Sequence, residues 1–322
     1  MRISIRSIAI ALHITLACAG ALAQGFPTKP VRLLLPYPPG GGTDFFARTV
    51  SQKMSESLGQ PVIVDNRPGA STIIAVETLM NAPPDGHTVM IGGNSTFALN
   101  PALFKKLPYD PQKSFVPVTL TGRYLLTLVA NPAVPVQKIE DMLQLARAGT
   151  MTNYASPGTG TIHHLAMELV KQRANVNMVG VAYKGSAPAM TDVMSGQIGV
   201  MFADLAAVAP HVKSGKLRVI AVASPRRASV LPSVPTVAES GFPGFEAWAW
   251  QGMIAPAGTP AAIVEKLREA YAKAVDDAVV RSRLADVGIE PLSSTPQEMA
   301  DYMLAEKITW TKVIREANIA PE

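Results

Sequence analysis

Two turns of the sequence combine glycines with hydroxyl and acidic side chains, each between a short apolar run and a helix-like pattern. The first turn is residues 37–44, YPPGGGTD, and the second is residues 156–161, SPGTGT. A turn of this kind leaves backbone N–H groups free beside the positive end of a helix dipole, and its glycines let a ligand approach them. Each turn is therefore typical of an anion-binding site.

The alternative is that each segment is only a tight strand-to-helix turn, with Thr43, Asp44 or Thr161 capping the helix. For one turn alone we favour that alternative, but two matched turns about 115 residues apart favour a shared site. Nucleotide motifs fit less well, because neither turn ends in Gly-Lys-Ser/Thr and His163 stands where the dinucleotide fingerprint needs glycine. Zinc-protease and nucleophile-elbow motifs are absent from the sequence as well.

Other polar residues also follow apolar runs. Asn94, Ser95 and Thr96 come after such a run, where open α/β sheets place ligands, so we expect one of the three to contact the ligand. The adjacent His163 and His164 lack an acidic or cysteine partner at metal-ligand spacing, and we expect them at helix-surface or core positions. The sequence predicts no metal site and no cofactor.

The first residues have the pattern of a secretory signal peptide. Arg2 and Arg6 precede a short apolar run that ends in the small-residue segment 21–23, ALA. We therefore predict that residues 1–23 are removed and that the chain is exported. A membrane anchor would need about 20 apolar residues, and a lipoprotein interpretation of Cys18 lacks the usual leucine three positions upstream. Cys18 is the single cysteine, so the mature chain would have no thiol, no disulfide and no cysteine nucleophile.

Composition indicates a globular protein, since 48% of the residues are hydrophobic and 16% are charged. Removing two arginines from 29 basic residues leaves 27 against 24 acidic ones, a net charge of +3 without any basic run, which argues against nucleic-acid binding. Short apolar runs alternate with helix-length amphipathic stretches, which predicts α/β layers. At 299 residues after cleavage, we expect two domains.

Many ordered blocks of the chain resemble the Bug family, the periplasmic solute receptors of tripartite tricarboxylate transporters. They are 26–32 FPTKPVR, 38–44 PPGGGTD, 64–70 VDNRPGA, 84–88 PDGHT, 107–111 LPYDP, 183–189 YKGSAPA, 234–236 VPT and 255–260 APAGTP. The resemblance implies a two-lobed, type II periplasmic binding fold, with two α/β domains joined by two crossover segments. It also implies a small carboxylate gripped by the two glycine turns, one from each lobe.

The resemblance suggests roles for two further residues. Lys184 would offer a cation at the cleft, although a solvated lysine is the simpler interpretation. Asp204 would accept a hydrogen bond from a donor group of the ligand, or else would cap the helix that follows it. Trp248 and Trp250 share one side of an extended segment and are expected to pack at a hinge or in a core, with stacking against the ligand as the alternative. The residues predicted to bind the ligand are Tyr37, Pro39, Gly40, Gly41, Gly42, Thr43, Asp44, Asn94, Ser95, Thr96, Ser156, Gly158, Thr159, Gly160, Thr161, Lys184 and Asp204.

One stretch departs from the family pattern. After residues 66–70, NRPGA, the family usually has a glycine pair, an asparagine and a further glycine, whereas this chain has Ser71, Thr72, Ile73 and Ala75. We therefore expect unusual ligand identity or backbone geometry there. The chain crossings are predicted near residues 125–129 and 248–254, which gives a first lobe of residues 24–125 plus 250–322 and a second lobe of residues 126–249.

The leading hypothesis is a monomeric receptor that captures a carboxylate by hinge closure and delivers it to the membrane permease subunits of a tripartite tricarboxylate transporter. One alternative is a sensory receptor for a membrane kinase. Another is a secreted hydrolase or lyase using Asp44 or Asp204 with His163, but the sequence pairs neither with a matched acid or base, so we expect no enzymatic activity.

Overall fold

The structure is a computed structural model that describes residues 25–316 and residue 319. The predicted signal peptide, residues 1–23, lies outside the described residues, and so does Cys18. Within the described part, no helix has both the length and the apolar composition needed to cross a bilayer.

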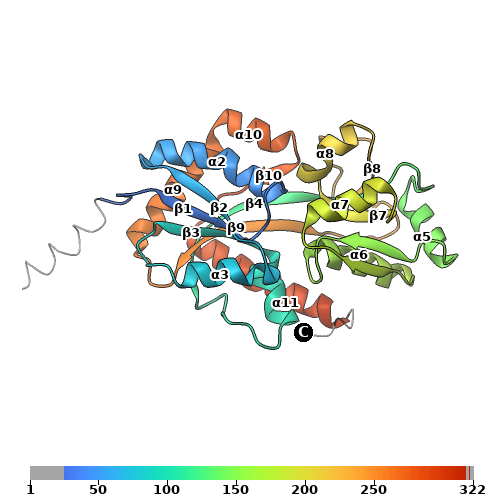
Figure 1. The fold of residues 1–322 in the computed structure, drawn as a ribbon, viewed down its shortest axis with the longest axis horizontal. Helices are drawn as coiled ribbons and strands as arrows, with labels where there is room; N and C mark the ends of the chain where they lie inside the picture. Colours follow the sequence, from blue (N-terminus) through green and yellow to red (C-terminus); the bar gives the residue numbers. More distant parts are fainter. Residues whose placement is uncertain (1–24, 317–318, 320–322) are drawn as a thin grey trace, which may run out of the picture.

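One long strand, β4 (Phe115–Ala130), runs through the middle of the molecule (Figure 1). Its first part pairs antiparallel with β9 (Trp248–Pro256), and its last residues pair antiparallel with β7 (Val200–Asp204). The change of partner falls between Leu125 and Leu126. The strands therefore form two groups, which we call the first and the second lobe.

The first lobe contains parallel strands that are covered by helices on both faces. Besides β9 and the first part of β4, its elements are β1 (Val31–Leu35), β2 (Val62–Asn66), β3 (Thr88–Gly93), β10 (Ile289–Pro291), η1 (Ala70–Thr72), η2 (Ser95–Leu99), α2 (Gly42–Leu58), α3 (Ile73–Met80), α4 (Asn100–Leu103), α9 (Ala261–Asp276), α10 (Ala278–Ala285) and α11 (Pro296–Glu316). Alternate side chains of β1 enter different cores: Leu33 packs with α2 and α9, whereas Leu34 packs with α3 and α11. Burial on both faces is what a parallel sheet requires.

The second lobe repeats this arrangement. Besides β7 and the end of β4, its elements are β5 (Asn153–Ser156), β6 (Val179–Ala182), β8 (Arg218–Val222), α5 (Ile139–Arg147), α6 (Ile162–Ala174), α7 (Ser186–Ser195) and α8 (Leu205–Lys213). Phe202 of β7 packs with α5 and α6, and its neighbour Met201 packs with α7 and α8. The strand order through both lobes is β2-β1-β3-β9-β4-β7-β5-β6, with β8 and β10 also paired to β4.

Helix α11 contacts both lobes. Met303 near its start belongs to a first-lobe core, whereas Trp310 near its end belongs to the core under α5 and α6. Between them, Glu306 accepts hydrogen bonds from the indole N–H groups of Trp250 at 2.6 Å and Trp310 at 3.0 Å. Burial raises the pKa of Glu306, although the two indole donors act in the opposite direction. The C-terminal helix therefore ties strand β9 to the second lobe.

Several short-range features of the sequence are visible in the structure. The apolar side chains of α2 at four-residue steps are all buried, and the helix ends at Gly59, whose φ of 70° is left-handed. Thr295 and Glu298 form a capping box at the start of α11, because each accepts a hydrogen bond from the backbone N–H of the other at 3.2 Å and 2.8 Å. Trp250 is buried in a core against Phe97, as expected. The exact residue bounds of the two lobes remain a prediction.

Candidate functional site

A cavity of about 120 Å³ lies between the lobes, where several strands end. This volume is several times the roughly 30 Å³ that one water molecule takes in the liquid, so it accommodates a small organic molecule. The segments after β1, β3, β5 and β6 reach it, and so does the last residue of β7. Its lining residues are Tyr37, Pro38, Pro39, Gly41, Gly42, Thr43, Asn94, Ser95, Pro157, Thr161, Ile162, His163, Gly185, Ser186, Ala187, Asp204, Ala249, Trp250 and Gln251.

Three helices begin at this inner cavity, since the first residues of α2, α6 and α7 all line it. Gly41 precedes α2 and Gly185 precedes α7, and at neither helix does a side chain cap the first turn. The leading backbone N–H groups of these helices therefore remain available to a ligand. Three positive dipole ends directed at one cavity favour a negatively charged occupant.

The sequence identified the starts of α2 and α6 as candidate ligand contacts but not the start of α7. Ser186 and Ala187, the first residues of α7, also line the cavity. The preceding Gly185 has a φ of 116°, and a β-carbon there would lie 3.1 Å from Pro38 of the opposite lobe. Glycine at this position thus permits the close approach of the two lobes.

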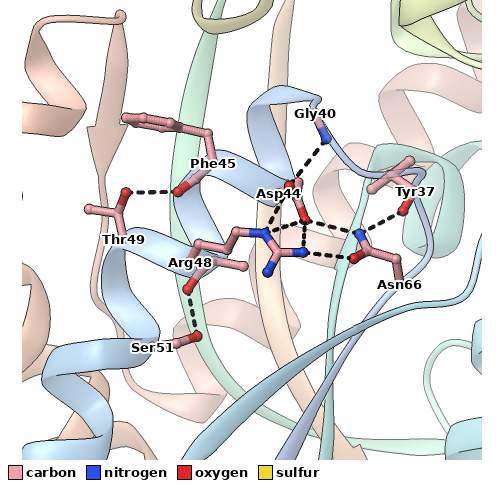
Figure 2. Close-up of polar contacts among 9 residues, drawn as sticks. Tyr37, Gly40, Asp44, Phe45, Arg48, Thr49, Ser51 and Asn66 are labelled. Atoms are coloured by element: carbon pink, nitrogen blue, oxygen red, sulfur yellow. Dashed lines mark hydrogen bonds and ion pairs between the residues drawn. The ribbon is translucent and has the colours of Figure 1, made fainter.

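Asp44 was predicted to contact the ligand, but it does not line the cavity. Figure 2 shows its carboxylate directed toward the interior of the first turn, where it accepts hydrogen bonds from Gly40 N–H and Asn66 Nδ2, both at 3.1 Å, and is paired with Arg48. Burial alone would raise the pKa of Asp44, but these donors outweigh it and hold the pKa below its usual range. Asp44 and Gly40 therefore shape the turn.

In the second glycine turn, residues 156–161, several backbone N–H groups are already occupied by hydrogen bonds to nearby side chains. Gly160 N–H donates to His164 Nδ1 at 3.1 Å, and Gly158 N–H donates to Ser156 Oγ at 3.3 Å. Thr161 accepts from His164 N–H, so the alternative interpretation of Thr161 as a helix cap is correct. Thr161 nevertheless lines the cavity as well.

The three residues after β3 differ in role. Asn94 Nδ2 donates to Trp248 O at 3.2 Å and Asn94 Oδ1 accepts from Trp250 N–H at 3.0 Å, so this side chain fastens β9 beside the cavity. Thr96 is fully buried and donates to Thr72 Oγ1, away from the cavity. Ser95 lines the cavity, and its hydroxyl forms no hydrogen bond with another described residue. Ser95 is therefore the one of the three that offers a free donor.

Tyr37 faces the cavity from the first lobe. Burial raises the pKa of its phenol well above the usual range, and the negative charge of Asp204 adds to this effect. The hydroxyl therefore stays protonated and available to donate a hydrogen bond. The neighbouring Thr43 hydroxyl contacts Gln251 Nε2, and Gln251 Oε1 accepts from Tyr124 at 2.6 Å. Gln251 was missed in the sequence because nothing in its neighbourhood forms a motif.

His163 corrects a sequence prediction. It was expected on a helix surface or in a core without an acidic partner, but it lines the cavity, and its Nε2 lies 3.1 Å from Asp204 Oδ1. Asp204 is the residue before α8, yet its side chain does not cap that helix. An aspartate–histidine pair forms part of a nucleophilic triad. Here His163 Nδ1 is buried without a partner in the described structure, so no hydroxyl nucleophile is joined to the pair.

A larger outer cavity of about 760 Å³ adjoins the inner one and shares Tyr37, Ser95 and Thr161 with it. Gly158, Thr159, Gly160 and the exposed Lys184 line only this outer space. The sequence that departs from the family pattern also lines it. Ala70, Ser71 and Thr72 have φ values of 44°, 49° and 81°, so three consecutive residues other than glycine adopt a left-handed backbone.

The inner cavity has one acidic side chain, Asp204, and no lysine or arginine among its lining residues. No group of three or more histidine, cysteine or acidic residues in the described part is arranged to hold a metal ion. The geometry therefore suits an anion bound by backbone dipoles, the Tyr37 phenol and serine hydroxyls, with Asp204 beside it.

Comparison with known proteins agrees with this geometry. The family model described as tripartite tricarboxylate transporter family receptor, TctC, matches residues 46–319. The solved structure of the periplasmic binding protein BugD is 30% identical, with a TM-score of 0.87 over 92% of this chain and 100% of BugD. The sequence-based resemblance and the predicted two-lobed α/β fold are thus confirmed.

Two similar structures contain carboxylates. Rpa4515 from R. palustris, solved with adipate, is 34% identical, with a TM-score of 0.89 over 92% of this chain and 100% of that one. MatC (Rpa3494) from Rhodopseudomonas palustris, solved with bound malate, is also 34% identical, with a TM-score of 0.83 over 90% of this chain and 100% of that one.

Proposed function

This chain belongs to the tripartite tricarboxylate transporter receptor family, and on that premise we propose that it captures a small organic carboxylate between its two lobes in the periplasm. The observation that carries the proposal is the convergence of the starts of α2, α6 and α7 on one cavity. The adipate-bound and malate-bound relatives support the ligand class.

Backbone dipoles can supply the required affinity. Each helix start contributes about 0.3–2 kcal/mol toward a nearby anion, and each hydrogen bond to a charged group contributes about 1.5–3 kcal/mol. Three helix starts with the hydroxyls of Tyr37 and Ser95 thus reach roughly −8 kcal/mol, which corresponds to micromolar binding. A buried arginine is not needed for such a site.

We further propose that closure of the lobes completes the site and creates the surface that membrane permease subunits recognise. Gly42 of the first lobe and Asp204 of the second lobe both line the cavity, so a ligand held there touches both lobes. Closure excludes water and strengthens the amide contacts. The role is transport by a monomeric receptor, without a covalent step.

Calorimetry with a panel of di- and monocarboxylates, each paired with its uncharged amide, tests the proposal. We expect at least one acid to bind at micromolar concentration and its amide to bind at least a hundredfold more weakly. X-ray scattering should show a smaller radius of gyration with the bound acid. Equal binding of acid and amide would contradict the anion site, and turnover of an ester would favour the hydrolase alternative. Pull-down of a membrane kinase would favour the sensory one.

A further inference from the structure

We propose that Asp204 accepts a hydrogen bond from a donor group on the carbon next to the captured carboxylate, and that His163 positions Asp204 for this contact. The inference rests on the proposed function, because it assumes a carboxylate at the start of α2. It narrows the ligand class to acids that carry a hydroxyl or an ammonium group beside the carboxylate.

The two oxygens of Asp204 have different surroundings. Oδ1 lies 3.1 Å from His163 Nε2, whereas Oδ2 has no hydrogen-bond partner among the described residues. The Asp204 side chain is only 15% exposed, and it lines the inner cavity. A largely buried carboxylate oxygen without a donor is unfavourable, so Oδ2 is an acceptor that a ligand can satisfy.

The position of Oδ2 indicates which ligand atom it meets. A β-carbon on Gly42, the first residue of α2, would lie 3.6 Å from Asp204 Oδ2. Because Oδ2 lies this close to the first residue of α2, we place the adjacent carbon of a carboxylate bound to the free N–H groups of α2 beside Oδ2. A hydroxyl or ammonium group on that carbon is placed to donate to Oδ2, and an unsubstituted acid leaves Oδ2 unpaired.

His163 fixes the direction of the Asp204 carboxylate. An ionised carboxylate only accepts hydrogen bonds, so with Asp204 ionised His163 Nε2 is the donor of this contact. His163 Nδ1 is buried without a partner in the described structure, so the Asp204 contact is the ring's only polar anchor there. Both residues come from the second lobe, from the first turn of α6 and the end of β7, so the pair does not depend on lobe closure.

Calorimetry on the mature protein with matched acids tests the inference. The pairs are succinate and malate, glutarate and 2-hydroxyglutarate, adipate and 2-hydroxyadipate, and propionate and lactate, with aspartate and glutamate as ammonium-bearing members. We expect the donor-bearing acid of the best-binding skeleton to bind at least tenfold more tightly than the plain acid, since sites built to pair with a ligand donor reject analogues that lack it.

Variants of Asp204 and His163 distinguish their proposed roles in the ligand preference from a general loss of binding. Asp204→Ala should reduce the preference for the donor-bearing acid to less than threefold. Asp204→Asn keeps an acceptor oxygen without the charge, so it should retain a preference for hydroxyl and lose one for ammonium. His163→Leu should reduce the preference for the donor-bearing acid, and His163→Gln, which keeps a donor at a similar place, should restore it.

The outcomes distinguish two failures. Failure of every acid to bind would overturn the proposed function and this inference with it. Binding of plain and donor-bearing acids with equal affinity in the natural protein would overturn only the inference. A preference for the donor-bearing acid that persists in Asp204→Ala would also overturn the inference. If the preference is unaltered in His163→Leu, His163 does not position Asp204.

Discussion

Gly160 of the second lobe packs directly against Leu103 of α4 across the cleft, so closely that a β-carbon on Gly160 would overlap Leu103 Cδ1. The φ of Gly160 is 69°, which also favours glycine. This contact, together with that of Gly185 and Pro38, brings the lobes close enough for three helix starts to share one cavity.

Gly160→Ala should therefore weaken binding of the tightest carboxylate at least tenfold, because the added methyl group holds the lobes apart. Gly149 is a matched control, since its φ is 70° and a β-carbon there would meet nothing within 4 Å. Gly149→Ala should show a similar loss of stability, about 1 kcal/mol, with unchanged affinity. Calorimetry and thermal denaturation measure both; equal affinity losses in the two variants would refute a specific role for the Gly160 contact.

Ser95 and Thr96 provide a second matched pair. Ser95→Ala should lower carboxylate affinity about tenfold and leave stability nearly unchanged, because Ser95 lines the cavity and its hydroxyl forms no hydrogen bond with another described residue. Thr96→Val should do the reverse, with a loss of about 1 kcal/mol of stability, because its hydroxyl bonds to Thr72 in the interior. Calorimetry and urea denaturation distinguish them. Normal affinity in Ser95→Ala would count against direct contact with the ligand.

His164 should make stability depend on pH. Burial lowers its pKa below the usual 6.5, Glu168 opposes this shift and Lys171 adds to it. The unfolded chain therefore takes up the proton more readily than the folded protein. The stabilising contribution is complete above about pH 6.5 and is lost as the pH falls through the lower folded-state pKa.

Protonation would also remove the acceptor that His164 Nδ1 offers to Gly160 N–H. Urea denaturation at several pH values between 7.5 and 5 measures the effect. His164→Asn, whose side-chain oxygen can accept the same hydrogen bond without titrating, should show a smaller slope over this range. A variant slope as steep as that of the natural protein would assign the pH dependence to other groups.

The left-handed backbone at Ser71 should lower the stability of the folded protein. Residues other than glycine in this conformation are destabilised by about 1 kcal/mol or more, and glycine relieves that strain. Ser71→Gly should therefore raise the free energy of unfolding by up to about 1 kcal/mol in urea denaturation. The matched variant Thr72→Gly should gain less or lose stability, because it removes the Thr72 hydroxyl that bonds to Thr96. A loss of stability in Ser71→Gly would contradict the strain.

The fold was predictable because local patterns and resemblance agree. The apolar spacing of α2, its end at Gly59 and the Thr295–Glu298 capping box are short-range features that sequence contains. The two glycine turns were predictable as parts of one site for the same reason, since each carries its own glycines and hydroxyls beside a helix start.

The errors at the site arise from contacts distant in sequence. His163 and Asp204 are 41 residues apart, and their pairing depends on β7 lying beside β5 in the sheet. Sequence reasoning assigned Asp44 to the ligand because it stands in the glycine turn, but Asn66, 22 residues away, and Arg48 engage its carboxylate. The cavity-lining position of Gln251 depends on the return of β9 between β3 and β4.

A crystal structure of the protein with its tightest-binding acid would show which groups hold the carboxylate. We expect a carboxylate of the ligand within hydrogen-bond distance of the first backbone N–H groups of α2 and of α6 or α7, enclosed between the lobes. An acid bound outside that cavity, or held by side chains of one lobe alone, would contradict it.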